Sequence, residues 1–570
     1  MKNRLLATLV TVALILTLVV SANAASETNP NLGAGLYPGT SEPGVITVDC
    51  ATMSKLNPIL MTYGTELSMA RHLWDAPVKL DVDNNVIPGA AESWTVSDDS
   101  LTWTFKIRQG MKWVNSKGEV VADVTAKDFE FGIKELLNPE VAAEYYYMAS
   151  IFANADAYYA YKSGTSEVVV EWDQVGVKAL DDYTLELKLE RVLPYFLQQI
   201  KFEVFAPIYE PFYTEVGAAN YCTSPETGLY TGAFYMTEWV LENKVVTVKN
   251  PYWYDAANVT LEGVVYAKYV DTNARLNAFM GGEIDLIDLA GGEQRAIFEA
   301  EGFTVSSYVG GYSFYYLCNN TDVSDLRSPS LRKAISAAID RWQFINTIRK
   351  DSSVPAACFT LGVSGVNTPN FSDAVVAANG GEPLYNPVAD PELAKSYLPK
   401  ALEELGYTDI SQIKVVLMTS EGTLNEATSQ LIQEQLRVNL GLDVGIEVLT
   451  ITEARARRNA KNYDIFFTGW GPDYNDPMTD LDLWVTGGGN NHSGYSSAEY
   501  DALIEAAKVE TDMVAREQLF VQMEMLLAED MPIIPIFWRA EDYVVSEKMV
   551  SGYTRMPFQQ INLFYTRLAD

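Results

Sequence analysis

Histidine is scarce in this chain of 570 residues, which contains only His72 and His492. A zinc site with three histidine ligands is therefore excluded, and a Ser-His-Asp triad would have to use one of these two side chains. His72 lies among apolar residues with helical spacing and His492 in a polar, glycine-rich stretch. Packing for the first and a loop position for the second are favoured over ligation.

Common catalytic signatures are also missing. The sequence has no Walker A, GxGxxG, HExxH or GxSxG motif, so the usual nucleotide, zinc-protease and hydrolase classes have no support. The four cysteines, Cys50, Cys222, Cys318 and Cys358, include no CxxC pair. Three pairings that use all four cysteines are possible, and the spacing does not select one of them. One structural disulfide, or four buried free thiols, is the alternative.

Basic residues are few relative to acidic ones. Lys+Arg number 41 and Asp+Glu 75, which gives a formal charge of −34, and such a charge repels a nucleic acid backbone. The hydrophobic fraction of 48 % and the charged fraction of 20 % are typical of a chain that folds. At roughly 150 residues per domain, the length predicts two to four domains.

The amino terminus has the pattern of a secretory signal. Residues 1–4 are basic, residues 5–20 are mostly apolar, and Ala22-Asn23-Ala24 is a small-x-small cleavage pattern. We expect a signal peptide at 1–24 and a flexible, Gly- and Pro-rich leader at 25–44. No cysteine stands at the cleavage point, so a protein that is soluble after export is expected, without a lipoprotein anchor.

Strand and helix patterns alternate along the rest of the chain. Residues 101–108 and 183–189 alternate apolar with polar side chains, as a half-buried strand does. Thr125 and Asp128 have the spacing of a capping box, and apolar stripes predict helices after Pro329 and near 431–440. The fold class is therefore predicted as α/β or mixed α+β.

The segment 464–477 is the clearest candidate for a site. An apolar, strand-like run ends in Gly469-Trp470-Gly471-Pro472, and Asp473 follows directly. This arrangement predicts a cleft rim, where Trp470 is an apolar wall, Gly471 allows close backbone approach and Asp473 faces a cation. The alternative is a turn in which the aspartates make local backbone hydrogen bonds.

Several short motifs in a fixed order carry a family resemblance. From about residue 45 to the C-terminus, the chain resembles the oligopeptide/dipeptide-binding family of ABC-importer solute-binding proteins, bacterial extracellular solute-binding protein family 5. Segments at 176–182 and 192–196 are more similar to its oligopeptide branch than to its nickel-binding branch. The motifs are Ala91-Glu92-Ser93-Trp94 with 101–105, Val124 to Phe129, Tyr230 to Phe234, Lys249 to Trp253, Gly282 to Asp285, Leu331 to Arg341, and Gly469 to Pro477.

The resemblance implies a two-lobed, venus-flytrap fold. Lobe 1 would combine a base domain (45–74, 205–311 and 540–570) with an inserted domain (75–204), and lobe 2 would span 312–539. The implied function is capture of oligopeptides in the interlobe cleft and delivery to a membrane-embedded ABC permease. A monomer located in the periplasm or outside the cell, with no catalytic activity and no cofactor, is expected.

The resemblance also implies roles for residues of lobe 2. Asp473 matches the family aspartate that pairs with the α-ammonium of a peptide, with Trp470 and Gly471 beside it. Arg458 matches an arginine available to a peptide carboxylate. The alternative for Arg458, together with Arg455 and Arg457, is a solvated basic helix face.

Lobe 1 is expected to contribute the other wall. Tyr145 matches a tyrosine that lines the groove. Tyr63, Gly64 and Thr65, with the preceding Thr62, match an extended segment whose backbone pairs with the peptide as an added strand.

Three positions depart from the family pattern. Ile451 stands where relatives have a groove tryptophan, Phe467 where one has a second arginine, and Asp288 where a groove tyrosine occurs. Peptide length and side-chain preference are therefore not set by the motifs. An oligosaccharide-binding relative with the same fold is the alternative function, and a secreted glycoside hydrolase is a remote one, which would need two opposed carboxylates.

Overall fold

The computed structural model describes residues 43–50, 53, 55–61, 64–81, 85–556 and 560–569. The predicted signal peptide, almost all of the predicted leader, Thr62 and Tyr63 lie outside these residues. No helix within them is long and apolar enough to cross a membrane.

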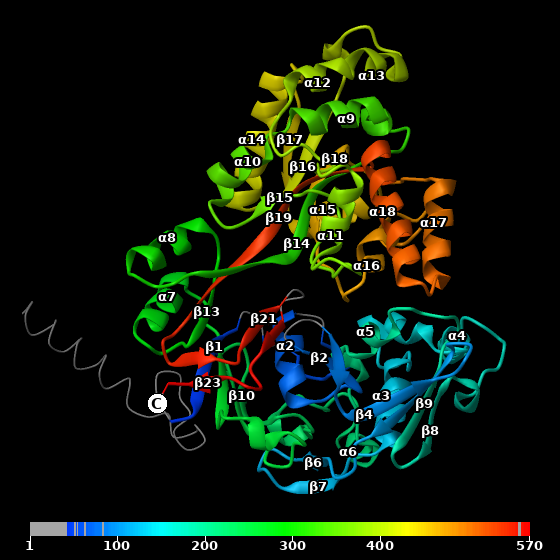
Figure 1. Ribbon diagram of the computed structural model, residues 1–570, viewed down its shortest axis with the longest axis vertical. Helices are drawn as coiled ribbons and strands as arrows, with labels where there is room; N and C mark the ends of the chain where they lie inside the picture. The colour runs from blue at the N-terminus through cyan, green and yellow to red at the C-terminus, as the bar shows by residue number, and fades with distance from the viewer. Residues whose placement is uncertain are drawn as a thin grey trace, which may run out of the picture.

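A mixed sheet of 11 strands runs through the molecule (Figure 1), in the order β10-β11-β12-β1-β13-β19-β14-β18-β16-β17, with β15 paired to β19. Strand β1 is parallel to β12 and β13, and β16 is parallel to β17 and β18, whereas the remaining pairs are antiparallel. The strands are β1 (Val45–Asp49), β10 (Phe234–Val240), β11 (Lys244–Lys249), β12 (Gly263–Ala267), β13 (Leu286–Leu289), β14 (Ser306–Cys318), β15 (Val354–Pro355), β16 (Val416–Ser420), β17 (Gly445–Leu449), β18 (Ile465–Trp470) and β19 (Ile533–Val545).

Strands β14 and β19, each of 13 residues, connect two lobes. Figure 1 shows them passing from the lower half of the molecule, beside β13, to the upper half, beside β18. Their antiparallel register shifts between Val309 and Tyr312. One hydrophobic cluster joins residues between 46 and 286 with residues 549–564, and two others contain only residues between 315 and 538. Each lobe therefore has its own core: the first cluster lies in the lower lobe, and the other two lie in the upper lobe.

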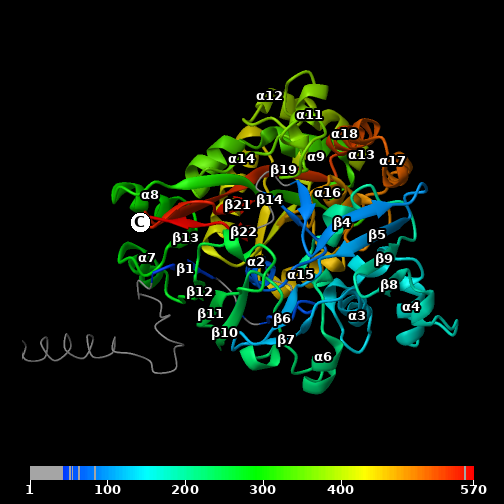
Figure 2. The ribbon, with the colours of Figure 1, turned by 60° about the horizontal axis from the view of Figure 1, so that its bottom comes forward.

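The lower lobe contains a second, four-stranded sheet, β4 (Ala91–Val96), β5 (Thr102–Ile107), β9 (Thr184–Lys188) and β8 (Val177–Asp181), in that order. Figure 2 shows it at the opposite side of this lobe from helices α7 (Thr272–Met280) and α8 (Gly292–Ala300). Helix α3 (Ala126–Leu136) begins with the predicted capping box of Thr125 and Asp128. The strands predicted at 101–108 and 183–189 are β5 and β9.

Helices cover the sheet of the upper lobe. The helices predicted after Pro329 and near 431–440 are α9 (Pro329–Ala338) and α14 (Thr423–Asn439), and α17 (Ala498–Val509) lies in the same lobe. Helix α9 begins with Ser328 accepting a hydrogen bond from Leu331 N at 3.0 Å. The remaining α-helices and strands of the described residues are α2 (Gly64–Leu73), α4 (Ala155–Lys162), α5 (Phe196–Ile200), α6 (Glu210–Val216), α10 (Arg341–Phe344), α11 (Phe371–Ala378), α12 (Pro391–Ser396), α13 (Leu398–Leu405), α15 (Ile451–Asn459), α16 (Met478–Leu481), α18 (Met513–Asp530), β2 (Val78–Leu80), β3 (Val86–Pro88), β6 (Lys112–Val114), β7 (Val120–Asp123), β20 (Met549–Ser551), β21 (Thr554–Met556), β22 (Gln560–Asn562) and β23 (Arg567–Leu568).

His72 packs in the core, as its helical spacing predicts. Its Nδ1 lies 2.9 Å from the carbonyl of Ser68, and its Nε2 accepts a hydrogen bond from Leu563 N at 3.1 Å. Burial and the nearby Arg71 lower the pKa of His72 to about 3. Within the part of the chain that the structure describes, no group of three or more His, Cys, Asp or Glu side chains could hold a metal. All four cysteines are buried, with no disulfide between them.

The buried His72 makes a prediction about folding stability. Between pH 6.5 and about 3 the unfolded chain binds a proton at this residue that the folded chain does not, so stability should fall as the pH falls. We expect His72→Gln to reduce the slope of the unfolding free energy between pH 6 and 4 by up to about 1.4 kcal/mol per pH unit. Urea unfolding of both proteins at stepped pH measures this. Equal slopes would contradict a neutral, buried His72.

Candidate functional site

A loop between β18 and α16 carries the predicted site, and Thr479 fixes its shape. The Thr479 hydroxyl accepts a hydrogen bond from Asp473 N at 2.9 Å, and the Thr479 carbonyl accepts one from the indole of Trp470 at 3.2 Å. Asp476 accepts from Met478 N at 3.0 Å, as the turn interpretation predicts. The loop is therefore held by its own polar groups, and the side chain of Asp473 is not used for this purpose.

Asp473 is a half-buried carboxylate with spare hydrogen-bonding capacity. No described residue donates a hydrogen bond to its side chain, although the ammonium of Lys201 in the other lobe interacts with it electrostatically. Burial raises the pKa of Asp473 to about 6, and Lys201 partly opposes this rise. A carboxylate taken from water without a hydrogen-bond donor is costly for the folded protein, and an incoming cation would remove that cost.

Lys201, which interacts with Asp473 from the lower lobe, lines one cavity with Glu203 and Arg71. Arg71 and Glu203 form an ion pair. Burial lowers the pKa of Lys201 to about 8, and both Glu203 and Asp473 oppose the change. Lys201 therefore has acidic neighbours in both lobes, Glu203 in its own lobe and Asp473 in the other. No local sequence pattern predicted a role for these residues.

The short 3-10 helix η2 (Glu144–Ile151) presents two tyrosines to Asp473. Burial raises the pKa of Tyr145 and of Tyr147, and the negative charge of Asp473 raises both further. The ring of Tyr145 meets that of Phe202 edge-on at 5.1 Å. The structure thus brings Tyr145 and Asp473 together across the lobes. Tyr147 belongs to the same run of tyrosines and was not singled out by the motif match.

An aromatic contact joins the lobes beside Asp473. Tyr195 stacks on Tyr474, with ring centroids 5.0 Å apart and planes 7° from parallel. The guanidinium of Arg516 lies 5.3 Å from the Tyr195 ring. Tyr195 also packs against the cores of both lobes, so it links the position of the loop to the distance between the lobes.

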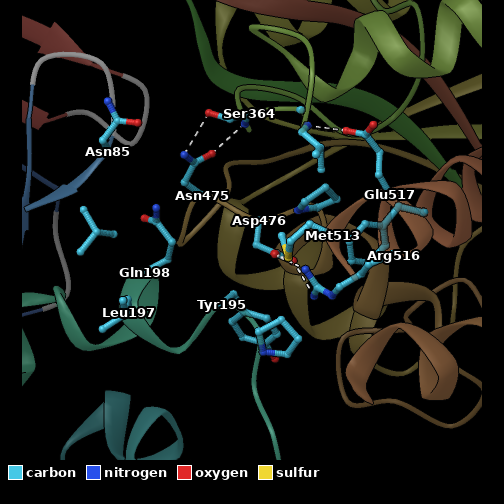
Figure 3. A pocket seen from close by; sticks show the side chains of 16 residues that line it. Asn85, Tyr195, Leu197, Gln198, Ser364, Asn475, Asp476, Met513, Arg516 and Glu517 are labelled. Atoms are coloured by element: carbon cyan, nitrogen blue, oxygen red, sulfur yellow. Dashed lines mark hydrogen bonds and ion pairs between the residues drawn. The ribbon is translucent and has the colours of Figure 1, made fainter. Parts of the chain in front are cut away.

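A cavity of about 410 Å³ lies next to this contact and is lined from both lobes. Figure 3 shows Asp476 directed at Arg516 and Asn475 directed at Ser364. Asn475 exchanges two hydrogen bonds with Ser364, at 2.7 and 3.0 Å. Asp473 does not line this cavity. The lining residues are Asn85, Val86, Pro194, Tyr195, Leu197, Gln198, Ser364, Gly365, Val366, Asn475, Asp476, Pro477, Met513, Arg516, Glu517 and Phe520.

Trp470 and Gly471 are half-buried, and Trp470 packs against the upper core. Arg458, near the end of α15, donates to Asn459 Oδ1 at 3.1 and 2.9 Å. Its described contacts are within the upper lobe, so the structure does not bring it to Asp473. Arg457 pairs with Glu447 at 2.7 Å and Arg455 is exposed, as a solvated helix face predicts.

The expectation of an extended segment at Gly64 and Thr65 is wrong. These residues form the first turn of α2, because the apolar residues that follow, such as Leu67 and Leu73, have helical spacing and are buried in the lower core. Thr65 instead lines a smaller cavity, which also contains Asp288. Tyr63 lies outside the described residues, and its predicted role stays a prediction.

Two lobes with separate cores, joined by two long strands and with polar and aromatic side chains facing a shared space, define a bilobal binding protein. The chain belongs to the bacterial extracellular solute-binding proteins, family 5, whose middle-region model matches residues 85–492. The family resemblance read from the motifs and the two-lobed α/β fold are therefore confirmed.

Relatives of known name and structure agree with this. The chain is 28 % identical over 492 residues to the dipeptide-binding protein DppE of Bacillus subtilis, covering 86 % of each chain. It is 27 % identical to the oligopeptide-binding protein OppA of the same species, covering 95 % of each. Among solved structures, the substrate-binding domain of an oligopeptide ABC transporter from Bacillus anthracis has a TM-score of 0.71 at 27 % identity, covering 92 % of this chain and 99 % of that one. Listeria monocytogenes OppA bound to peptide has the same TM-score and coverage at 25 % identity.

Proposed function

We propose that this chain is an exported solute-binding protein that captures oligopeptides between its lobes and delivers them to an ABC permease. The single observation that carries the proposal is the half-buried carboxylate of Asp473, which has no hydrogen-bond donor among the described residues and faces Tyr145 and Lys201 across the lobes. The names of the relatives and the peptide-bound OppA structure support the ligand class.

The mechanism is differential binding between two lobes. An α-ammonium placed at Asp473 forms a charge-assisted hydrogen bond, worth about 1.5–3 kcal/mol, in a space from which water is largely removed. Contacts made to Tyr145 on the other lobe exist only when the lobes are close, so the ligand stabilises the closed state. No covalent bond is broken during ligand binding and lobe closure, and the protein acts by binding without catalysis.

The domain boundaries are part of the proposal. The inserted domain at 75–204 is joined to the base domain (45–74, 205–311 and 540–570) through the shared lower core. Lobe 2 spans 312–539, with β14 and β19 crossing near both of its limits. We further propose a monomer that acts outside the cytoplasm after removal of a signal peptide.

Calorimetric titration with a tetrapeptide and its N-acetylated form tests the proposal. We expect the free-amine peptide to bind and the acetylated one to bind much more weakly at pH 7.0. Since the carboxylate of Asp473 must be ionised and its pKa is about 6, affinity for the free amine should fall about tenfold between pH 7.0 and 5.0. Equal affinity for both forms, or binding of a neutral oligosaccharide with no binding of either peptide, would overturn the proposal.

A further inference from the structure

A second cavity, of about 210 Å³, lies where the two crossing strands meet the lower lobe. Its walls come from β1, β12 and α2 on one side and from β14, β19 and β21 on the other. Five of its described lining residues are charged. The charged residues of the lining are Asp49, Asp288, Arg539, Glu541 and Arg555.

Arg539 is held in this cavity as a flat, oriented guanidinium. It lies opposite Tyr312 in the β14–β19 ladder, and its guanidinium carbon is 4.4 Å from the centre of the Tyr312 ring. Its Nε donates to Glu541 Oε1 at 2.8 Å, and its Nη2 donates to the same oxygen. No described residue accepts a hydrogen bond from Nη1. Arginine fixed in this way can still donate to a planar anion.

This cavity is close to the Asp473 site. In the β14 ladders, Ser313 pairs with Trp470, and its neighbour Tyr312 pairs with Arg539. The hydroxyl of Tyr145 interacts electrostatically with both Asp473 and Tyr312. A chain lying along Tyr145 would therefore have Asp473 at one side and Arg539 at the other.

The donors that remain unused in the cavity favour an anion. Each of its three carboxylates already has an arginine: Asp49 with Arg275, Asp288 with Arg555, and Glu541 with Arg539. An added ammonium would find no unpaired carboxylate. The unused groups are donors, because among the described residues nothing accepts from Nε of the buried Arg555 or from Nη1 of Arg539. Buried arginine with an unused donor attracts an acceptor of negative charge.

We infer that this cavity binds a carboxylate of the captured ligand through Arg539, with Arg555 adding positive charge behind it. The inference rests on the proposed peptide function and assigns to Arg539 the role that the motif match gave to Arg458. The carboxylate can come from the C-terminus of a short peptide or from an acidic side chain. At either source, the ligand would be recognised by opposite charges at its two ends.

Titration at pH 7.0 with four ligands distinguishes these sources. They are Ala-Ala-Ala-Ala as the acid and as the amide, and Ala-Ala-Glu-Ala-amide and Ala-Ala-Gln-Ala-amide. In the wild-type protein we expect at least one carboxylate ligand to bind about tenfold more tightly than its neutral partner. Arg539→Gln should reduce this preference to twofold or less and leave the affinity for the neutral amide unchanged. Arg458→Gln, the matched control, should keep the preference.

A second variant tests the inference without removing the arginine. Glu541→Gln frees Arg539 from its competing carboxylate and should tighten the binding of the carboxylate ligands a few-fold. Absence of any carboxylate preference, or its loss in Arg458→Gln with retention in Arg539→Gln, would overturn the inference and leave the peptide function in place. Failure of all four ligands to bind would overturn the proposed function itself.

Discussion

Replacing Asp473 by asparagine is expected to weaken the binding of a free-amine peptide at least 100-fold at neutral pH. The substitution keeps the size of the side chain and removes the charge that neutralises an enclosed ammonium. Truncating one partner of a buried, hydrogen-bonded charge pair costs about 2–5 kcal/mol, and about 2.8 kcal/mol corresponds to a factor of 100. Calorimetric titration of both proteins with the tetrapeptide at pH 7.0 measures the loss.

Two controls separate this effect from general damage to the site. N-acetylated peptide should bind the wild type and Asp473→Asn alike, and Glu144→Gln, which removes an exposed charge beside Tyr145, should bind the free amine normally. Without ligand, Asp473→Asn should be more stable than the wild type by up to about 3 kcal/mol at pH 7. Burial raises the folded pKa above its usual 3.8, so the ionised form costs stability as the pH rises through this range. Unchanged peptide affinity would show that Asp473 is not the amine partner.

Arg516→Met is expected to destabilise the protein by about 3–5 kcal/mol, because it leaves Asp476 as a buried charge without a partner. The Arg516 side chain is 1 % exposed and its Nη1 and Nη2 both bond to Asp476. Its Nε donates to the carbonyl of Ala507 at 2.8 Å, and its guanidinium lies 4.5 Å from the Phe520 ring. Urea unfolding at pH 7 measures the change.

The double variant Arg516→Met/Asp476→Asn is the control for this prediction. It removes both charges, so it should recover a large part of the lost stability, and the difference gives the coupling between them. The single variant should also bind peptide more weakly, because Asp476 lies in the same loop as Asp473. A loss below about 1 kcal/mol in Arg516→Met would contradict the strong buried pair.

Local sequence predicted the loop that carries the candidate site. An apolar run followed by Gly469-Trp470-Gly471-Pro472 specifies a strand that must end, and the following aspartate must then lie at the end of the strand. The strand at β5 and the capped start of α3 were predicted for the same reason, since each depends on residues only a few positions apart. The family and its two-lobed fold followed from several such motifs in order.

The other half of the site could not be predicted in this way. Tyr195 and Lys201 flank α5 and Arg539 belongs to β19, and both segments are distant in the chain from Asp473. Their roles depend on tertiary packing that no local pattern encodes. At Gly64 the motif match led to a wrong conformation, because buried apolar residues further along specify a helix. At Arg458, by contrast, the predicted helix is present as α15, but the hydrogen bonds of the side chain to Asn459 were not predicted by the motif match.

The two crossing strands have a mechanical consequence. Each lobe keeps its hydrophobic interior when the strands flex, and the irregular pairing between Val309 and Tyr312 is a place where a two-stranded ribbon can bend without losing much of its ladder. Opening and shutting therefore require little work against the core. The free energy of ligand binding is then not spent on repacking either hydrophobic core, and it can go into holding the closed state.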